Sequence, residues 1–427
     1  MNVVTLLFGS FTILLLLGAP ITLALGVASM SALYFLGNDL VYLVQVAYTS
    51  VDSFPLMALP AFILAGALME YSGISRRLVA LAETLVGPAT GGLASATVLA
   101  CLFFGAISGS GPATTAAVGM LMIPAMIRRG YDKGYASAIT ASSGGLGVVI
   151  PPSIPMVIYG VSGNQSITQL FIAGFLPGVV IASALMTVNY ILCRKKGYRG
   201  SGHAWSGRAV LKALRDGVWS ILAPVIILGG IYSGFFTPTE AAVVAIFYTV
   251  FIGVFVHKEL RWDGCARSFE TCTWLTGRVL LIMFTARAFG RLLVQYRIPE
   301  IIANAMLAMT NNVFIIWALV IAFLIFVGMF METLATIMIL TPVLLPVMMK
   351  LGVDPIHFGI VLVCCCEIGF ETPPLGENLF IASGIAGSSL EEISIKAIPF
   401  AAISIAAVFL IAFVPQISLF LPHLLGY

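Results

Sequence analysis

A short stretch of small polar residues, glycines and a proline interrupts two strongly apolar runs near residue 110. Residues 104–115 read FGAISGSGPATT. The runs on either side, 92–107 and 112–127, would each be about 24 Å long as helices. A bilayer core is roughly 30 Å thick, so each run predicts half a span that ends at a non-helical tip. Irregular backbone at membrane depth is tolerated only where protein or water satisfies its polar groups, and transporters bind ions and substrates at such breaks.

Composition places this interruption inside a multi-pass helical membrane protein. Hydrophobic residues make up 60% of the chain and charged residues 9%, and apolar runs recur from residue 3 to residue 425. The loop 194–216 holds seven basic residues and one acid, which indicates a cytoplasmic position. The net charge of +3 indicates no nucleic-acid partner, because basic residues in such proteins mainly set orientation. We expect residues 1–17 to form a retained first span, since they lack a basic start and a small-residue cleavage site.

The two halves of the chain share an internal repeat at a constant offset of 222 residues. The matching pairs are Pro124 with Pro346, Gly130 with Gly352, Asp132 with Asp354, Gly147 with Gly369, and Pro151-Pro152 with Pro373-Pro374. On this register the tip at 108–110 falls opposite Phe330-Met331-Glu332. Interrupted apolar segments at corresponding positions of two halves indicate a secondary-transporter site. More basic residues follow the first hairpin than the second, which favours opposite orientations of the two repeats.

The helix breaks offer oxygen atoms of the kind that a sodium ion requires. Sodium is a hard cation that takes several oxygen ligands, and freed carbonyls with serine or threonine hydroxyls supply them without a buried carboxylate. We predict a first sodium site and a second one at the two tips and the breaks that face them. The first set is Ser108, Gly109, Ser110, Gly147, Ile150 and Pro152, and the second is Glu332, Thr333, Gly369, Thr372 and Pro373. Small residues at these positions also suit close helix packing, which is the structural alternative.

A further set of polar and charged residues near the breaks is predicted to contact the substrate. Its members are Ser110, Ser153, Asn164, Ser166, Arg287, Arg291, Glu332, Thr336 and Asn378. Arg287 and Arg291 are one turn apart on an apolar helix and suit an anion, although they equally suit a role as anchors at the helix end. The carboxylates Glu332, Glu367, Glu371 and Glu377 are costly at depth, so proton coupling is an open alternative for this half of the chain.

At these motifs the chain resembles the large membrane subunit of TRAP (tripartite ATP-independent periplasmic) transporters and is similar to their sialic-acid branch. The resemblance rests on GAISGS at 105–110, Ala113-Thr114, IPAM at 123–126, Gly130-Tyr131 and IPPS at 150–153. It implies an all-α polytopic membrane protein with two inverted repeats, each with a re-entrant hairpin and a broken helix. It also implies an elevator mechanism, in which a transport domain moves against a scaffold, and sodium at the places where tips meet breaks.

The resemblance divides the chain into six parts. Residues 1–90 are expected to be N-terminal scaffold helices, and residues 91–193 the first repeat core, with its hairpin tip at 108–111 and its broken helix at 147–155. Residues 194–216 would be a basic cytoplasmic connector, and residues 217–311 the scaffold helices of the second half. The second repeat core would be 312–397, with its tip at 330–333 and its broken helix at 369–375, followed by a C-terminal span at 398–427.

The resemblance also implies partners and a location. The location is the cytoplasmic (inner) membrane of a bacterium. A small four-helix membrane subunit pairs with the large one, and we expect it to be a separate polypeptide because this chain begins directly at the large subunit. A soluble periplasmic binding protein is expected to deliver the substrate. No cofactor is expected other than Na⁺ as the coupling ion.

The function predicted from the sequence is sodium-coupled import of an organic acid anion, with sialic acid favoured and a C4-dicarboxylate next. A proton-coupled carrier that works without a binding protein is the alternative. An ion channel with re-entrant filter loops is less consistent with two different tips and paired double prolines. An intramembrane enzyme is not expected, because the broken segments hold no histidine, and the aspartates nearest to them, Asp132 and Asp354, are predicted to lie in loops.

Overall fold

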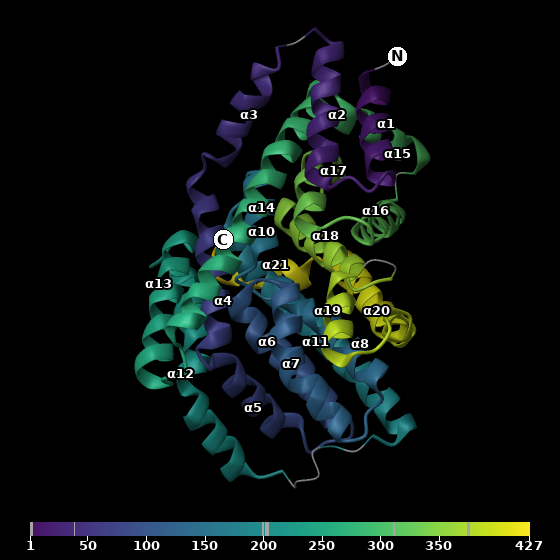
Figure 1. Cartoon of the computed structure of the whole chain (residues 1–427). Coiled ribbons are helices and arrows are strands. Elements are labelled where there is room, and N and C mark those ends of the chain that lie inside the picture. Colours follow the sequence, from purple (N-terminus) through teal and green to yellow (C-terminus); the bar gives the residue numbers. More distant parts are fainter. Residues whose placement is uncertain (1–2, 38, 199, 201–204, 311, 374–375) are drawn as a thin grey trace.

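The computed structural model describes residues 3–37, 39–198, 200, 205–310, 312–373 and 376–427, and the described part consists of helices and connecting loops (Figure 1). Six helices are long and apolar enough to cross a bilayer within this part, and the number rises to eight if each of two bent pairs forms one span. The prediction of an all-α polytopic membrane protein is confirmed. Pro374 and Leu375, part of the predicted second break, lie outside the described residues.

The helices of the first half run from α1 to α11, and a 3₁₀ turn at Phe54–Met57 precedes α4. They are α1 Val3–Leu16, α2 Ile21–Phe35, α3 Val41–Val51, α4 Ala58–Tyr71, α5 Ile74–Val86, α6 Gly92–Ser108, α7 Gly111–Arg128, α8 Lys133–Gly144, α9 Leu146–Val149, α10 Ile154–Gly163 and α11 Ile167–Lys196. The second half runs from α12 to α21, and a π-helical turn at Ile252–Val256 continues α13. They are α12 Gly207–Tyr232, α13 Pro238–Phe251, α14 Trp262–Gln295, α15 Ile298–Met309, α16 Val313–Gly328, α17 Thr333–Lys350, α18 Pro355–Phe370, α19 Glu377–Ala386, α20 Leu390–Phe413 and α21 Gln416–Leu424.

Local structure repeats at the offset of 222 residues that the sequence predicts. Asp132 caps the start of α8 by accepting from the Tyr135 N–H, and Asp354 caps α18 in the same way. The loops before them turn at Gly130 and Gly352, whose φ angles of 83° and 79° lie in the left-handed region that favours glycine. These caps and turns follow from short-range chemistry, which explains why both halves form them independently.

In each half, a pair of glycines lets the hairpin cross its broken helix at close range. A Cβ atom at Gly105 of α6 would lie 2.7 Å from the Cα atom of Gly147, and one at Gly369 would lie 2.7 Å from the Cα atom of Gly328. Gly147 and Gly369 match at the repeat offset, whereas Gly105 and Gly328 differ from it by one residue. Backbone therefore meets backbone at both crossings, which only glycine allows.

The two hairpins lie at opposite ends of the molecule. Figure 1 shows α6 and α7 in the lower half and α17 in the upper half. The second piece of each broken helix packs against the hairpin of the other repeat, because α10 contacts α17 and α19 contacts α7. The repeats are thus interlocked by crossed contacts.

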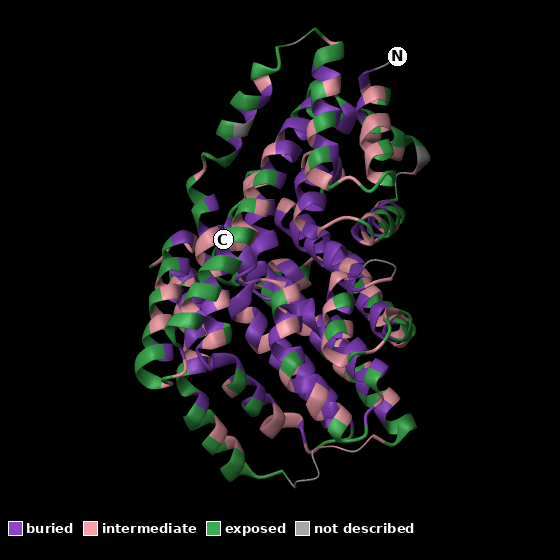
Figure 2. Cartoon of the chain, in the orientation of Figure 1, coloured by how far each residue is buried: buried purple, intermediate pink, exposed green. Residues whose placement is uncertain are grey.

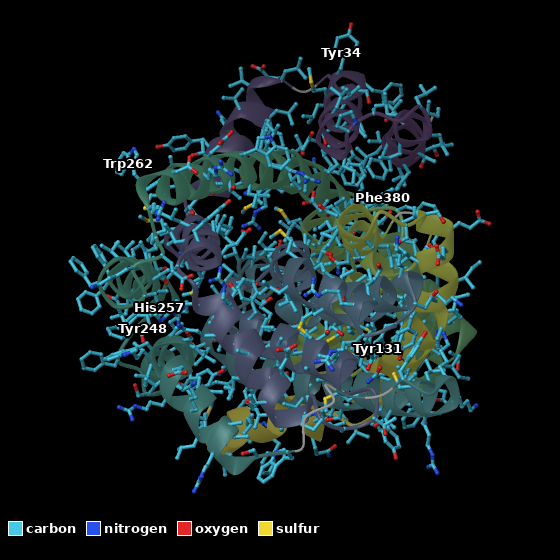
Figure 3. All side chains as sticks on the ribbon, turned by 60° about the horizontal axis from the view of Figure 1, so that its bottom comes forward. Tyr34, Tyr131, Tyr248, His257, Trp262 and Phe380 are labelled. Carbon is cyan, nitrogen blue, oxygen red and sulfur yellow. The ribbon has the colours of Figure 1, made fainter. Side chains whose placement is uncertain are left out.

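One long helix, α14, borders this core from outside. It packs against α2, α3, α4 and α17, and Trp262 at its start points away from the molecule (Figure 3). Figure 2 shows buried residues concentrated on the central helices, while exposed residues are more frequent on the outer helices. Phe235, Phe247 and Phe326 are 79%, 72% and 60% exposed, as expected of surfaces that face lipid.

Two predicted boundaries differ from the structure. Helix α12 begins at Gly207, inside the predicted basic connector, because residues 207–217 contain no proline and form a helix continuous with the span. The expected single C-terminal span is two helices, and α20 ends at Phe413 shortly before Pro415, which lacks a backbone donor.

Candidate functional site

The first hairpin tip is a sharp break between two helices. Helix α6 ends at Ser108, and Gly109 follows in the left-handed conformation with a φ of 65°. Ser110 is extended and caps α7, where its side chain accepts from the Ala113 N–H. Leaving helical geometry over these residues frees backbone groups for other partners.

Three oxygen atoms gather at this tip. The Ser110 carbonyl accepts from the Thr114 hydroxyl at 2.8 Å and from the Ser108 hydroxyl at 3.3 Å. The Ser108 and Thr114 hydroxyls are 2.8 Å apart. Thr114 was not among the predicted site residues, although its position one turn after Ser110 was a usable signal. All three residues are small, so their oxygens stay close to the backbone.

The broken helix of the same repeat meets this tip. The Gly109 carbonyl accepts from the Ile154 N–H at 3.2 Å, and a Cβ atom at Gly109 would lie 2.8 Å from the Pro152 carbonyl oxygen. A Cβ atom at Gly147 would overlap the Thr114 hydroxyl and lie 2.8 Å from the Ser110 carbonyl oxygen. Ile150, also in the predicted set, is buried and extended at the end of α9. The structure thus brings the residues of the predicted first sodium set to one place.

The second tip is built differently. Its Glu332 carbonyl accepts from the Thr336 hydroxyl at 3.0 Å, which repeats the contact of Thr114 in the first half. Thr333 is buried, and its hydroxyl has no hydrogen-bond partner among the residues that the structure describes. On the facing break, the Thr372 hydroxyl donates to the Ile368 carbonyl at 2.5 Å, and Pro373 follows in a turn. Gly369 packs on α16 rather than on the tip itself.

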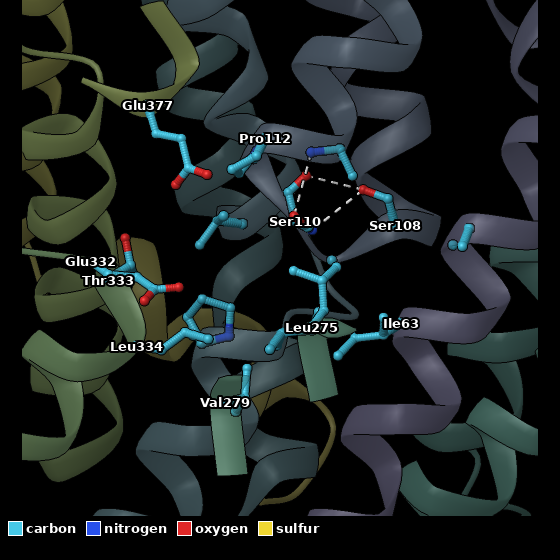
Figure 4. Close-up of a pocket in the computed structure, with 18 of the residues that line it drawn as sticks. Ile63, Ser108, Ser110, Pro112, Leu275, Val279, Glu332, Thr333, Leu334 and Glu377 are labelled. Atoms are coloured by element: carbon cyan, nitrogen blue, oxygen red, sulfur yellow. Dashed lines mark hydrogen bonds between the residues drawn. The ribbon is translucent and has the colours of Figure 1, made fainter. Parts of the chain in front are cut away.

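Both tips border one cavity of about 270 Å³ (Figure 4). Its walls include Ser108, Ser110, Glu332 and Thr333 from the tips, together with side chains of α4, α10, α14, α18 and α19. In Figure 4, Glu332 and Glu377 lie on one side, and Ser108 and Ser110 lie on the other. A solute in this cavity would contact both repeats and the bordering helix α14.

Arg278 of α14 is a wall residue that the sequence reasoning missed. Its Nη2 atom lies 3.1 Å from Glu332 Oε2, and its guanidinium lies 5.5 Å from the centre of the Trp274 ring. Its side chain is 39% exposed, so the guanidinium keeps access to the open space. Arg278 is one of four arginines on this helix of 34 residues, so its charge alone did not single it out. Arginine offers a planar fork of donors that matches carboxylate and sulfonate groups.

The structure separates the remaining predicted substrate residues. Arg287 and Arg291 line a different cavity of about 330 Å³ together with Ser162. Asn164 ends α10, and Ser166 caps α11. Arg287 is nine residues beyond Arg278, which is about 13.5 Å along a helix. These four residues therefore do not line the cavity between the tips, and their contact with the substrate stays a prediction.

Three other predicted substrate residues lie in the core around the tips but make internal contacts. Ser153 is fully buried and caps α10 by accepting from the Met156 N–H at 3.3 Å. The Asn378 amide donates to Glu367 Oε1 at 3.0 Å. The Thr336 hydroxyl donates to the Glu332 carbonyl of the second tip. Of the predicted substrate set, Ser110 and Glu332 line the cavity between the tips.

Known sequences and structures resemble the chain over most of its length. The model of the family described as "Tripartite ATP-independent periplasmic transporter, DctM component" matches residues 8–417. The isethionate TRAP transporter permease DctMQ of Oleidesulfovibrio alaskensis is 44% identical over 97% of this chain, and the chain spans 65% of that protein. The C4-dicarboxylate large permease DctM of Pseudomonas aeruginosa is 41% identical over 89% of this chain and 88% of its own length. The sialic acid large permease SiaM of Vibrio cholerae is 36% identical over 97% of both chains.

Solved structures share the fold at lower sequence identity. The YdaH transporter of Alcanivorax borkumensis superposes with a TM-score of 0.65 at 16% identity and covers 88% of each chain. The MtrF protein of Neisseria gonorrhoeae gives a TM-score of 0.56 at 15% identity and covers 87% of this chain and 83% of its own. At these identities the similarity concerns the arrangement of helices.

Proposed function

Because the chain belongs to the DctM component of the tripartite ATP-independent periplasmic (TRAP) transporter family, we propose that it imports a small organic anion by coupling to sodium. It is a multi-pass protein of the inner membrane and a large permease of the secondary-transporter kind. Its curated relatives are transporter permeases rather than enzymes. The proposal adds the ion, the substrate class and the residues that bind them.

The first hairpin tip supports the sodium part of the proposal. Ser108, Ser110 and Thr114 place three oxygens within 2.8–3.3 Å of one another, with the Pro152 carbonyl close by across the Gly109 contact. A hard cation is coordinated by several oxygen atoms of this neutral kind. These oxygens now satisfy one another, so an ion would exchange hydrogen bonds for coordination and hold the tip against the break. This oxygen cluster at a tip-to-break contact is the observation that carries the proposal.

The cavity wall supports an anionic substrate. Arg278 supplies a guanidinium whose partner, Glu332, belongs to the second hairpin tip. An incoming carboxylate or sulfonate can compete for this fork, and the tip would then be repositioned around the bound anion. Sodium at the tips and an anion at Arg278 would each favour the same closed arrangement, which couples their binding.

We place isethionate and C4-dicarboxylates first among the candidate substrates. The relatives named for these anions are 44% and 41% identical to this chain, whereas SiaM, named for sialic acid, is 36% identical. The sialic acid favoured by the sequence reasoning stays in the test panel. As partners we propose a small four-helix permease on a separate chain and a periplasmic binding protein, as the tripartite name of the family suggests.

The test is uptake of radiolabelled isethionate, succinate and sialic acid into proteoliposomes. These contain the chain with its small permease, and are supplied with the binding protein under an inward sodium gradient. We expect sodium-dependent uptake of one of these anions. Replacing Ser108 and Thr114 by alanine together is expected to lower that uptake by at least about 100-fold, because two hydroxyl ligands of the ion, worth about 1.5–3 kcal/mol each, are removed.

A matched control is Ser183→Ala. Ser183 is on α11, and its hydroxyl donates to the Val179 carbonyl within its own helix. We expect uptake by this variant to equal that of the wild type. Equal wild-type uptake with sodium replaced by choline would refute the sodium coupling, and current that scales with substrate in the absence of counterflow would indicate a channel instead.

A further inference from the structure

We propose that the cavity lined by Arg287 and Arg291 is an entry site, which receives the substrate anion on the periplasmic side before the cavity between the tips does. This entry cavity has a volume of about 330 Å³ and is lined by parts of α3, α10, α14 and α17. The inference rests on the proposed import function and adds a second place for the substrate to it. Its ligand is a carboxylate or sulfonate group, the same chemistry that we propose for Arg278.

Two arginines give the entry cavity a positive wall without a counter-charge. Arg287 is half-buried, Arg291 is exposed, and they stand one turn apart on α14. Within the part of the chain that the structure describes, neither of them forms an ion pair. The described residues that line the cavity include no acid, and Asp52, two residues beyond the lining residue Ser50, is exposed. Like charges at this spacing repel each other, so an anion between them would relieve the repulsion.

Hydroxyl groups from two other helices add further donors. Thr49 of α3 and Ser162 of α10 line the same cavity as the two guanidinium groups. Arginines near the end of a helix also suit a role as anchors, but an anchor needs only lipid headgroups as neighbours. The convergence of hydroxyls from α3 and α10 on the arginines favours a binding site instead. An oxyanion accepts hydrogen bonds from both kinds of donor.

Three helices, α10, α14 and α17, line both the entry cavity and the cavity between the tips. On α17, Leu334 belongs to the wall between the tips, and Met338 in the next turn belongs to the entry cavity. On α14 the corresponding residues are Val279 and Ala286. At about 1.5 Å per residue, these steps are about 6 Å and 10.5 Å along the helices. The two cavities are therefore neighbours, and an anion has only a short way from one to the other.

The course of α11 places the entry cavity on the periplasmic side. This helix follows α10 and runs for 30 residues from Ile167 to Lys196, which belongs to the predicted cytoplasmic connector. A helix of this length crosses the bilayer, so Ser162, near the start of α11, lies on the face away from the connector. Figure 1 agrees, because α3 and α17 lie in the upper half and α12, which follows the connector, lies in the lower half. A substrate delivered from the periplasm would meet the entry cavity first.

The experiment measures thiol modification of Ser162→Cys in the chain with its small permease, placed in phosphatidylcholine nanodiscs. Two methanethiosulfonate reagents are compared, one with a sulfonatoethyl group, which resembles isethionate, and one with a cationic trimethylammonioethyl group. We expect the ratio of the sulfonate rate to the ammonium rate to fall by about tenfold or more when Arg287→Met and Arg291→Met are added. With both arginines present, an excess of isethionate or of succinate should slow the sulfonate reagent.

Ser233→Cys is the matched control, because Ser233 is exposed at the end of α12, on the same side of the membrane, and does not line the cavity. Its rate ratio should not change when the arginines are replaced. The wild type gives the background rate, since its native cysteines are buried apart from the half-buried Cys265. Lysine at both arginine positions should keep most of the ratio, which separates loss of charge from loss of fold. The melting temperature in detergent checks the folding of every variant.

Uptake into proteoliposomes links the site to transport. Arg287→Met with Arg291→Met should raise the substrate KM by about tenfold and leave the rate at saturating substrate unchanged, because the arrival of the anion is slowed and its translocation is not. Arg297→Met is the control for uptake. Arg297 is exposed just beyond the end of the same helix and is not part of the cavity wall, so its KM should equal that of the wild type.

Equal rate ratios with and without the arginines, or an unchanged KM, would overturn the entry site. Phosphatidylglycerol added to the nanodiscs tests the other source of an anionic group. If it slowed the sulfonate reagent while isethionate and succinate did not, the occupant would be a lipid headgroup, which also overturns the proposal. The thiol assay needs no transport. Absent sodium dependence of uptake would therefore contradict the proposed function, whereas the anion site stands or falls by the thiol assay.

Discussion

Gly147→Ala is expected to reduce sodium-driven uptake to the level of liposomes without the protein. The added Cβ atom would overlap the Thr114 hydroxyl and lie 2.8 Å from the Ser110 carbonyl oxygen. Both atoms belong to the oxygen cluster at the first tip, and Thr114 is held by hydrogen bonds to Ser108 and Ser110. The tip must therefore move away from the break. Since ion sites tolerate misplacement of only about 0.5 Å, the sodium affinity should collapse.

The measurement is initial uptake as a function of sodium concentration. Gly229→Ala is the control, because Gly229 is also helical and a Cβ atom there would meet nothing within 4 Å. Gly369→Ala should resemble Gly147→Ala, since its Cβ atom would lie 2.7 Å from the Cα atom of Gly328. Normal sodium activation in Gly147→Ala, with correct insertion shown by size-exclusion chromatography, would mean that the tip-to-break contact is not the ion site.

Arg278→Met is expected to lower uptake at subsaturating substrate by about 100-fold or more. The substitution keeps an unbranched side chain but removes the donors for the anion, and hydrogen bonds to charged groups are worth about 1.5–3 kcal/mol each. It also leaves Glu332 without the partner that now lies at 3.1 Å. An unpaired carboxylate facing the cavity would repel an anionic substrate in addition. The loss should appear mainly as a higher substrate KM.

The double variant Arg278→Met with Glu332→Gln separates these two contributions. It removes both charges, so it should recover part of the affinity that repulsion by Glu332 costs, but not the part contributed by the guanidinium. Arg267→Met serves as the control, because Arg267 is 62% exposed and pairs with Asp263 within the same helix. An unchanged KM in Arg278→Met would remove this residue from the substrate site.

The hairpins were the most predictable part of the fold. Their helices were expected at 92–107 and 112–127 and are observed at Gly92–Ser108 and Gly111–Arg128. Glycine, serine and proline mark the ends of these helices, because their local backbone preferences can be read directly from the sequence. The start of helix α12 was less predictable, because its first turns mix apolar residues with the charged residues Arg208, Lys212, Arg215 and Asp216, so the segment was assigned to the basic connector. The break between α20 and α21 was not predicted, because Pro415 stands within an otherwise continuous apolar run.

The meeting of the first tip with the break at 147–152 was predictable for the same local reason, reinforced by the repeat, whereas sodium binding at this place stays a prediction. Arg278 could not be predicted as a site residue, because its role depends on a contact with Glu332, 54 residues away in the chain. Only the packing of α14 against α17 brings these two side chains together. Arg287 and Arg291 drew attention as a pair on one helix face, yet the direction in which α14 runs places them at another cavity. Sequence periodicity gives the face of a helix but not the neighbour that it meets.

The crossed packing of the two repeats has a mechanical consequence. Helix α10, the second piece of the first broken helix, contacts α17 of the second hairpin. Helix α19, the second piece of the second broken helix, contacts α7 of the first hairpin. Neither hairpin can shift without displacing a helix that packs against the other hairpin. The core is therefore expected to translate as one piece, and an ion that steadies one end of it also steadies the far end.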